Sequence, residues 1–169
     1  MEETKQNFAV QIFATDIDPK AIVTARSGAY PSDISDHVST ERLARFFTPL
    51  SDGNGYRIHK SIRDMLVFSE QNVIKDPPFS RLDLLSCRNL LIYMDSQLQK
   101  RLIPIFHYAL NPEGILFLGS SESVGEFSDL SDTLDQSSKL YQRKETNHTL
   151  RYTTASSKRL PPSANISTP

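Results

Sequence analysis

Apolar strand-like runs alternate with helical segments along this 169-residue chain, and that order constrains its fold most strongly. Residues 8–15 form a short apolar run of strand-forming residues that ends at Asp16. Pro19 suits the first turn of a following helix, and Gly28 suits the end of that helix. A strand, a turn and a helix in this order open an α/β unit. The sequence therefore predicts a sheet rich in parallel strands.

The second half of the chain extends the same alternation. Residues 82–86 are nearly all apolar, which is typical of a strand buried on both faces. Residues 96–109 carry apolar side chains at helical spacing, and we expect Pro104 to kink that helix. Residues 114–121 predict another buried strand, and residues 138–144 a last one.

The stretch between the first helix and residue 65 is less regular. Residues 30–38 look like a loop, and residues 40–47 predict a short helix capped by Ser or Thr. A turn cluster, SDGNG, occupies residues 51–55. The alternation that follows, from Tyr56 to Ile62, favours a half-exposed strand or hairpin arm.

Composition excludes several classes of function. The formal net charge of −1 offers no basic field for a nucleic acid, so we expect no such partner. Cys87 is the one cysteine and fits a reducing compartment, so we expect a cytoplasmic protein. No apolar run is long enough to cross a membrane, so we do not expect insertion into one.

Metal chemistry has no support in the sequence, and the end of the chain lacks periodicity. The four histidines show no spacing typical of metal ligands, and His107 is expected to complement the dipole at the end of its helix. Residues 145–169 are rich in Ser, Thr, Pro and charge, and we expect a disordered tail there.

In parallel sheets, ligands bind at the carboxyl ends of the strands. That rule selects residues 16–18, 87–89 and 119–122. Asp16 stands where a nucleotide-binding sheet places a carboxylate for ribose hydroxyls. An alternative is that Asp16 and Asp18 cap the next helix, and the two roles can also divide between them. The 15 residues before Asp16 contain no glycine. They therefore leave no room for the first strand, glycine loop and helix of such a fold, and the matching pattern begins in the middle of the fold.

Arg88 and Asn89 follow a predicted buried strand, where an unpaired charge would be costly. Arg88 can therefore contact a ligand, or it can satisfy strand-end carbonyls or a nearby Asp. Tyr93 could lie in the same cleft, although a tyrosine in the segment LLIYM is more often part of a core.

These motifs together resemble one family. ATDIDPKAI, RFF, QNV, PFSRLDLLSCRNLLIYMD and LFLGSSES occur in the order of the second half of CheR-type chemotaxis receptor methyltransferases, over residues 8–144. The residues of these motifs are closer to those of hybrid proteins that join methylesterase, methyltransferase and sensor segments than to those of the short stand-alone enzyme. The resemblance implies a class I S-adenosylmethionine-dependent methyltransferase, a Rossmann-like α/β sheet lacking its first strand and glycine loop. A small inserted antiparallel β-subdomain is expected near residues 53–65, within a catalytic domain over residues 1–144.

The resemblance also implies residue roles, with S-adenosyl-L-methionine as cofactor. Asp16 matches the carboxylate that holds the cofactor ribose, and Asn72 with Val73 matches the pair along the adenine. Arg88 and Asn89 match cofactor contacts, and Arg88 is also taken as a catalytic candidate. Tyr93 matches an aromatic residue that helps to orient the substrate glutamate.

The chain also departs from the family's pattern. The family's helical N-terminal domain, its glycine-rich motif and an arginine near the transferred methyl would precede Met1. Thr48 and Pro49 stand where some members carry a further arginine. The first strand of the family sheet would lie beside residues 82–86, and without it that edge would expose apolar side chains.

The expected function is methylation of glutamate side chains in the cytoplasmic part of chemoreceptors, by a truncated catalytic domain. Methylesterase and sensor domains are expected as fused or associated partners. The alternative is a non-catalytic fragment that binds a receptor or regulator through the β-subdomain. A receiver-like regulator built on Asp16 and Asp18 ranks lower, because a matching phosphoacceptor and lysine are not evident.

Overall fold

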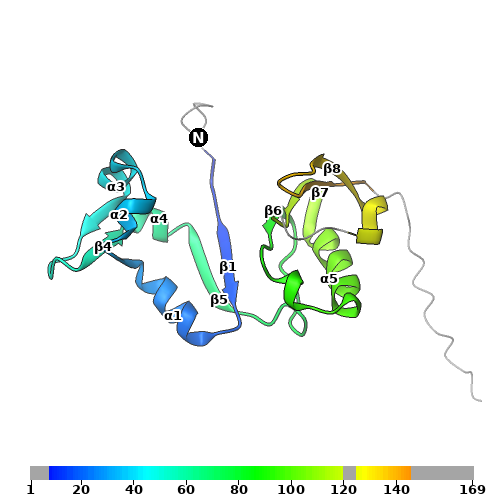
Figure 1. Cartoon of the computed structure of the whole chain (residues 1–169), viewed down its shortest axis with the longest axis horizontal. Coiled ribbons are helices and arrows are strands. Elements are labelled where there is room, and N and C mark those ends of the chain that lie inside the picture. The colour runs from blue at the N-terminus through cyan, green and yellow to red at the C-terminus, as the bar shows by residue number, and fades with distance from the viewer. Residues whose placement is uncertain (1–7, 120–124, 146–169) are drawn as a thin grey trace, which may run out of the picture. The chain divides into compact units, whose positions relative to one another are not determined.

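The computed structural model describes residues 8–119 and 125–145 (Figure 1). The chain divides into two compact units, residues 1–79 (unit 1) and residues 80–169 (unit 2). Each unit is described separately below. The expected catalytic domain, residues 1–144, spans parts of both.

Unit 1 is built on a parallel pair of strands. Strand β1 (Ile12–Asp16) pairs with β5 (Leu66–Glu70), so that Asp16 lies opposite Glu70. Helix α1 (Pro19–Ser27) follows β1 and packs against β5. The predicted strand, turn and helix are therefore confirmed, and Gly28 ends α1 in the left-handed conformation, with φ of 61°.

A small antiparallel sheet lies between α1 and β5 in the sequence. Its strand order is β2 (Ala29–Pro31), β4 (Gly55–Ile58) and β3 (Phe47–Pro49). Three short helices connect these strands: α2 (Ile34–His37), α3 (Thr40–Phe46) and α4 (Lys60–Arg63). The β-subdomain is therefore wider than the range expected from the sequence.

Two local expectations for this subdomain need correction, and one is confirmed. Residues 30–38 are not simply a loop, because they contain part of β2 and all of α2. The alternating pattern after Gly55 is a strand only as far as Ile58, since α4 begins at Lys60. The expected short helix is α3, whose N-terminus is capped by the Ser39 side chain.

Unit 2 is a four-stranded sheet with one long helix. Its strand order is β6 (Leu82–Ser86), β7 (Leu110–Phe117), β9 (Leu140–Arg143) and β8 (Ser131–Asp135). Strands β6 and β7 are parallel, whereas β9 is antiparallel to both of its neighbours. Two 3₁₀ helices, η1 (Leu91–Tyr93) and η2 (Gly125–Leu130), complete the unit. Strand β8 was not anticipated.

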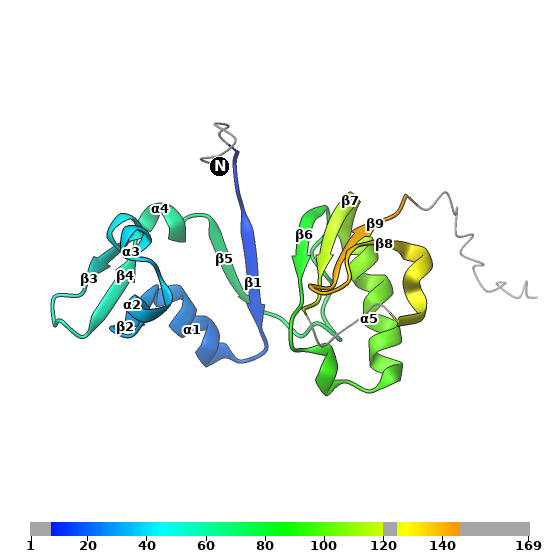
Figure 2. The ribbon, with the colours of Figure 1, turned by 45° about the horizontal axis from the view of Figure 1, so that its top comes forward.

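Helix α5 (Ser96–Ala109) packs along one face of this sheet (Figure 2). It begins at the predicted place, where the Asp95 side chain accepts a hydrogen bond from the Leu98 N–H. Leu102 and Phe106 of α5 are buried. Leu116, in β7, and Leu118, which directly follows that strand, are buried as well. This apolar cluster is the core of unit 2, and it fixes α5 against the sheet.

Strand β6 is correctly placed but not buried as expected. Leu84, in its centre, is 59% exposed. Among the described residues, β6 pairs with β7 on one edge and with no strand on the other. Burial of a strand depends on its neighbours, so an apolar sequence alone did not establish it. The resemblance led us to expect exposed apolar side chains at this edge, and Leu84 is one of them.

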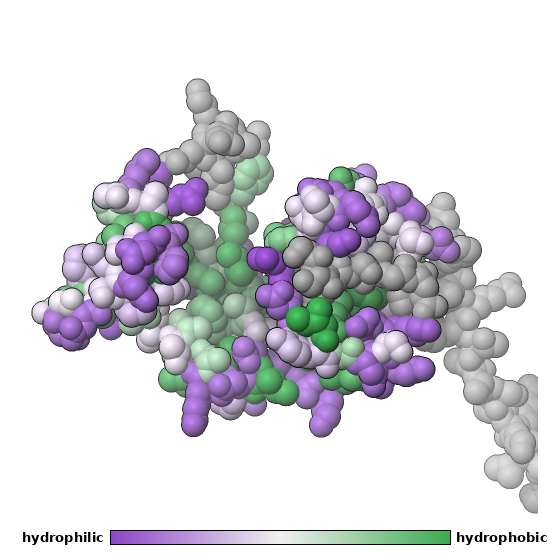
Figure 3. All heavy atoms as spheres, viewed as in Figure 1, coloured by the Kyte–Doolittle hydropathy of each residue, from purple (hydrophilic) through white to green (hydrophobic). Residues whose placement is uncertain are grey.

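A similar exposure occurs in unit 1. Strand β1 pairs only with β5 within the described part of the chain, and Ile12 and Phe13 remain 46% and 39% exposed. Figure 3 shows apolar side chains gathered over β1. Phe13 stacks on Phe79 with ring centroids 4.4 Å apart, which covers part of its ring. The parallel pair thus keeps an apolar surface that a further element could cover.

His107 lies in the last turn of α5, as expected, but its side chain is buried there. Its side chain is only 2% exposed, and neither ring nitrogen has a hydrogen-bond partner within the described residues. Burial lowers the pKa of His107, Arg143 lowers it further, and the nearby Leu130 carbonyl raises it by a smaller amount. Burial therefore disfavours the charged imidazolium at the helix end.

Four further expectations can be addressed only for the described residues. The predicted tail lies outside them from residue 146 onward, as do residues 120–122 of the third strand-end candidate. No described helix is long and apolar enough to span a membrane. In the same part of the chain, no group of three His, Cys, Asp or Glu side chains could hold a metal ion.

Candidate functional site

The first part of the candidate site is the exposed carboxylate of Asp16, at the carboxyl end of β1. Its Oδ1 accepts a hydrogen bond from the Asp18 N–H at 2.9 Å. The Asp18 carboxylate in turn accepts one from the Lys20 N–H at 2.9 Å and caps α1. The two roles weighed for this pair therefore divide: Asp18 is the cap. The second carboxylate oxygen of Asp16 has no partner among the described residues and can accept hydrogen bonds from a ligand diol.

The loop after β5 lies beside Asp16. The parallel register sets Glu70 opposite Asp16, and the Gln71 N–H donates a hydrogen bond to the Asp16 carbonyl at 2.9 Å. Asn72 and Val73, which follow directly, are both half-buried. Unit 1 therefore brings Asp16, Asn72 and Val73 to one end of the same strand pair.

The Asn72 side chain organises this loop. Its Oδ1 accepts hydrogen bonds from the N–H groups of Ile74 at 3.0 Å and Lys75 at 3.2 Å. Its backbone N–H donates to Asp76 Oδ2 at 2.7 Å. The side-chain oxygen of Asn72 is therefore committed to the turn, whereas its amide nitrogen makes no described contact and remains available as a donor.

Asp76 is a residue that sequence reasoning missed. Its carboxylate and its backbone N–H both bond to the Asn72 backbone, the latter donating to the Asn72 carbonyl at 2.8 Å. These contacts fix the position of Asn72. The available signal was the acidic residue before Pro77, because Asp commonly bonds neighbouring backbone groups in turns.

Arg88 is the main candidate in unit 2. Its guanidinium carbon lies 5.0 Å from the Phe117 ring centroid, over the end of β7. Within the described residues it makes no ion pair and no hydrogen bond, so the proposed contact with carbonyls or a nearby Asp does not occur there. A Cβ added at Gly119 would lie 3.0 Å from Arg88 Nε. Gly119 thus leaves room for the arginine side chain.

Asn89 and Tyr93 follow Arg88 on the same loop. Asn89 has a left-handed backbone with φ of 57°, which Asn tolerates better than most residues and which turns the chain after β6. Tyr93 is 82% exposed in η1, so the interpretation that it belongs to the core is wrong. Its hydroxyl and ring are accessible to another molecule.

Comparison with known proteins assigns the fold and the family. Residues 1–140 match the family described as "CheR methyltransferase, SAM binding domain". The chain belongs to this family. Its cofactor is therefore S-adenosyl-L-methionine, and its fold is of the class I methyltransferase type.

Several known proteins are similar to this chain. An uncharacterized 104.1 kDa protein of Rhodobacter capsulatus is 40% identical over 133 residues, which cover 79% of this chain and 14% of the relative. The putative methyltransferase Cher3 of Pseudomonas putida is 36% identical over 132 residues, 73% of this chain and 47% of the relative. The chain thus spans less than half the length of either relative. The solved N-methyltransferase NodS from Bradyrhizobium japonicum is 12% identical, with a TM-score of 0.48, over 80% of this chain and 74% of NodS.

The described residues fit the nucleoside end of such a cofactor. Asp16 has a carboxylate oxygen without a described partner, and such an oxygen is the kind of acceptor that a ribose diol requires. Asn72 supplies a free donor, and Val73 an apolar side chain beside it. These are kinds of group that can contact a diol and a heteroaromatic ring. The fit rests on unit 1, whereas Arg88, Asn89 and Tyr93 belong to unit 2.

Proposed function

We propose that this chain carries the nucleoside-binding part of a methyltransferase that esterifies glutamate side chains of cytoplasmic chemoreceptor segments. The observation that carries the proposal is that Asp16 and Asp18 have different roles. Asp18 caps α1, which leaves one oxygen of Asp16 free at the end of β1. The family match supplies the cofactor, and the exposed polar groups of unit 1 supply a matching surface.

Under this proposal the cofactor supplies an electrophilic methyl group. Asp16 holds the ribose through its free oxygen, and Asn72 and Val73 lie along the adenine. Arg88 and Asn89 are proposed as further cofactor contacts on the family resemblance. Because the Arg88 guanidinium has no described counter-ion, it can also draw an acidic substrate toward the site.

Tyr93 is proposed to orient the substrate glutamate, since its exposed hydroxyl can donate a hydrogen bond to a carboxylate. A carboxylate is already a nucleophile, so this reaction needs no strong base. Positioning and exclusion of water supply most of the rate enhancement. Esterification removes one negative charge from the receptor, which alters its local electrostatics.

Transfer of a radiolabelled methyl group to a purified cytoplasmic chemoreceptor segment tests this function. The proposal predicts label that is released by mild base, as expected for an ester, and a loss of transfer in Tyr93→Ala. Label that survives base, or that appears on a receptor segment whose glutamates are replaced by alanine, would contradict glutamate esterification.

A second candidate is a binding module without catalysis. It is favoured by the antiparallel sheet, whose outer strands β2 and β3 each pair only with β4 among the described residues. An extended receptor or regulator segment could add to such an edge. Peptide binding that is lost in Tyr56→Ala, in a chain without methyl transfer, would favour this candidate.

A further inference from the structure

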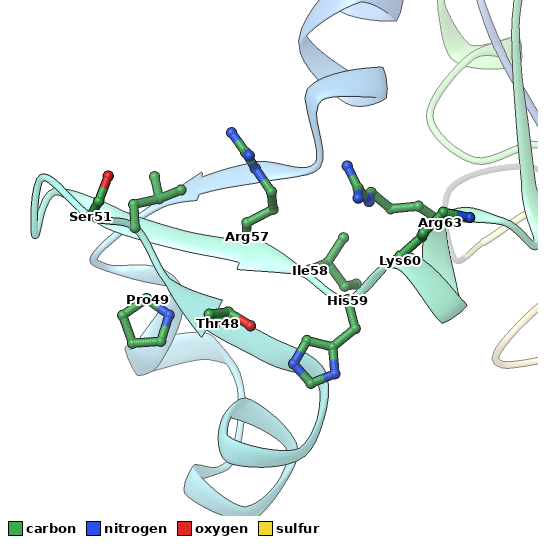
Figure 4. A pocket seen from close by; sticks show the side chains of 9 residues that line it. Thr48, Pro49, Ser51, Arg57, Ile58, His59, Lys60 and Arg63 are labelled. Atoms are coloured by element: carbon green, nitrogen blue, oxygen red, sulfur yellow. The ribbon is translucent and has the colours of Figure 1, made fainter.

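The turn between β3 and β4 ends in an asparagine that is followed by a glycine, Asn54 and Gly55. Ser51 lies in this turn, and His59 lies at the other end of the hairpin (Figure 4). No other asparagine of the chain precedes a glycine. The pair is therefore the one place in the sequence where a side-chain amide is followed by a backbone nitrogen without a neighbouring Cβ.

The sheet itself requires the glycine. Gly55 stands opposite Pro31 in the register of β4 and β2, and a Cβ added at Gly55 would collide with the carbonyl oxygen of Tyr30. Glycine is the residue that permits so close an approach of two backbones. The same lack of a Cβ leaves the Gly55 nitrogen unhindered. The packing of β2 on β4 therefore places the least hindered residue type directly after Asn54.

Neither reacting group of this pair is held by a hydrogen bond within the described residues. The Asn54 side chain is exposed and has no partner there, whereas its backbone N–H donates to Asp52 Oδ1 at 3.1 Å. The Gly55 carbonyl accepts a hydrogen bond from the Leu50 N–H at 2.9 Å, but the Gly55 N–H donates to no described acceptor. The nitrogen of Gly55 and the side-chain carbonyl of Asn54 are thus both available to react.

Asn72 provides a contrast within the same unit. Its Oδ1 accepts hydrogen bonds from the N–H groups of Ile74 and Lys75, which fix the side-chain amide in the turn. The residue after it, Val73, carries a β-branched side chain that crowds its own backbone nitrogen. We therefore expect Asn72 to be stable under conditions that convert Asn54.

We propose that Asn54 and Gly55 form a site of spontaneous deamidation. The Gly55 nitrogen loses its proton to a solvent base and attacks the side-chain carbonyl carbon of Asn54. A C–N bond forms, the bond to the side-chain nitrogen breaks, and ammonia leaves a five-membered succinimide ring. Water then opens the ring at either carbonyl, which gives aspartate or isoaspartate. Water is the one co-reactant, and no oxidant or reductant takes part.

Conversion would change the hairpin in two ways. The new carboxylate adds one negative charge to the formal net charge of −1. Isoaspartate also routes the backbone through the side-chain carbon, so the chain becomes one methylene longer directly before Gly55. That insertion disturbs the register of Gly55 with Pro31, and we expect converted chains to have a less stable β-subdomain. The proposal does not depend on the proposed methyl transfer.

The test is incubation of the folded whole chain at mildly alkaline pH, followed by brief tryptic digestion and mass spectrometry. Cleavage after Arg45 and Arg57 releases residues 46–57, in which Asn54 carries the sole side-chain amide. We expect this peptide to gain the mass that replaces NH₂ by OH, and to yield a separately eluting isoaspartate form. The gain should be slower at mildly acidic pH, because the Gly55 nitrogen must lose its proton. Residues 64–75, which contain Asn72, should keep their native mass.

A synthetic peptide of residues 46–57 gives the rate without the fold. Because exposed turns open at little cost in free energy, we expect the folded chain to react within about tenfold of the rate of the peptide. Asn54→Gln lengthens the side chain, so attack would need a six-membered ring, and this variant should keep its native mass. Retention of the native mass by the folded chain while the peptide converts would overturn the site. Conversion of residues 64–75 as fast as residues 46–57 would overturn it as well.

Discussion

The backbone N–H of Gln71 donates a hydrogen bond to the carbonyl oxygen of Asp16 at 2.9 Å, which joins the ends of β1 and β5. This contact explains how residues more than fifty positions apart in the sequence come to one place. It puts the loop of Asn72 next to the carboxylate that the family resemblance associates with ribose. The proposed nucleoside site depends on this junction.

Leu116 in β7 and Leu84 in the neighbouring strand β6 provide a matched test of burial. Leu116→Ala should lower the free energy of unfolding by about 2–5 kcal/mol, because Leu116 is only 2% exposed. Leu84→Ala should change it by less than about 1 kcal/mol, since Leu84 is 59% exposed. Urea unfolding of both variants measures the difference. Equal losses would mean that β6 is covered in solution.

Leu84 also shows what the sequence could predict. Strand β6 was placed correctly from its apolar run, α1 from Pro19 and Gly28 at its ends, and α5 from its apolar spacing. These signals are local, so they can be recognised in the sequence without knowing which strands or helices lie beside the segment. The burial of Leu84 was not predictable, because it depends on which strand lies beside β6.

The candidate site was predictable to a similar extent. Asp16 was correctly placed at a strand end, but only the hydrogen bond to Lys20 shows that Asp18 is the cap. The exposure of Tyr93 could not be derived from LLIYM, because apolar neighbours in a sequence do not fix which face a 3₁₀ turn presents. The burial of His107 likewise depends on contacts with distant elements.

His107 should make stability depend on pH. Its pKa in the folded state is lowered below 6.5 by burial first and by Arg143 second. The unfolded chain therefore binds more protons there, so the contribution of His107 is present above pH 6.5 and is lost as the pH falls below it. Thermal melting at pH 7.5 and 5.5 should show a smaller drop in His107→Gln than in the wild type. His37→Gln, an exposed substitution, serves as the control, and an equal drop in all three would refute the effect.

Tyr93→Ala should leave the stability of the chain unchanged within about 0.5 kcal/mol, because an 82% exposed side chain contributes little to packing. Thermal or urea unfolding checks this expectation. A loss of about 3–5 kcal/mol, which is typical for a buried aromatic residue, would show that the ring is part of a core.

Gly28→Ala should destabilise unit 1 more than Gly53→Ala. Both glycines have positive φ, 61° and 74°, so each substitution costs about 1–2 kcal/mol in backbone strain. A Cβ at Gly28 would also collide with Arg63 Cδ at 2.7 Å, whereas nothing lies within 4 Å at Gly53. Urea unfolding compares the two variants. Equal destabilisation would show that the Arg63 stem does not rest on Gly28.

The central claim is tested most directly by calorimetric titration of the chain with S-adenosyl-L-methionine. We predict saturable binding that weakens about 10- to 100-fold in Asp16→Ala, since a hydrogen bond to a charged group contributes about 1.5–3 kcal/mol. Asp18→Ala should lose about 1 kcal/mol of stability and keep its affinity, because Asp18 is the helix cap. Unchanged affinity in a folded Asp16→Ala chain, or an equal loss in Asp18→Ala, would contradict the role of Asp16 in holding the ribose.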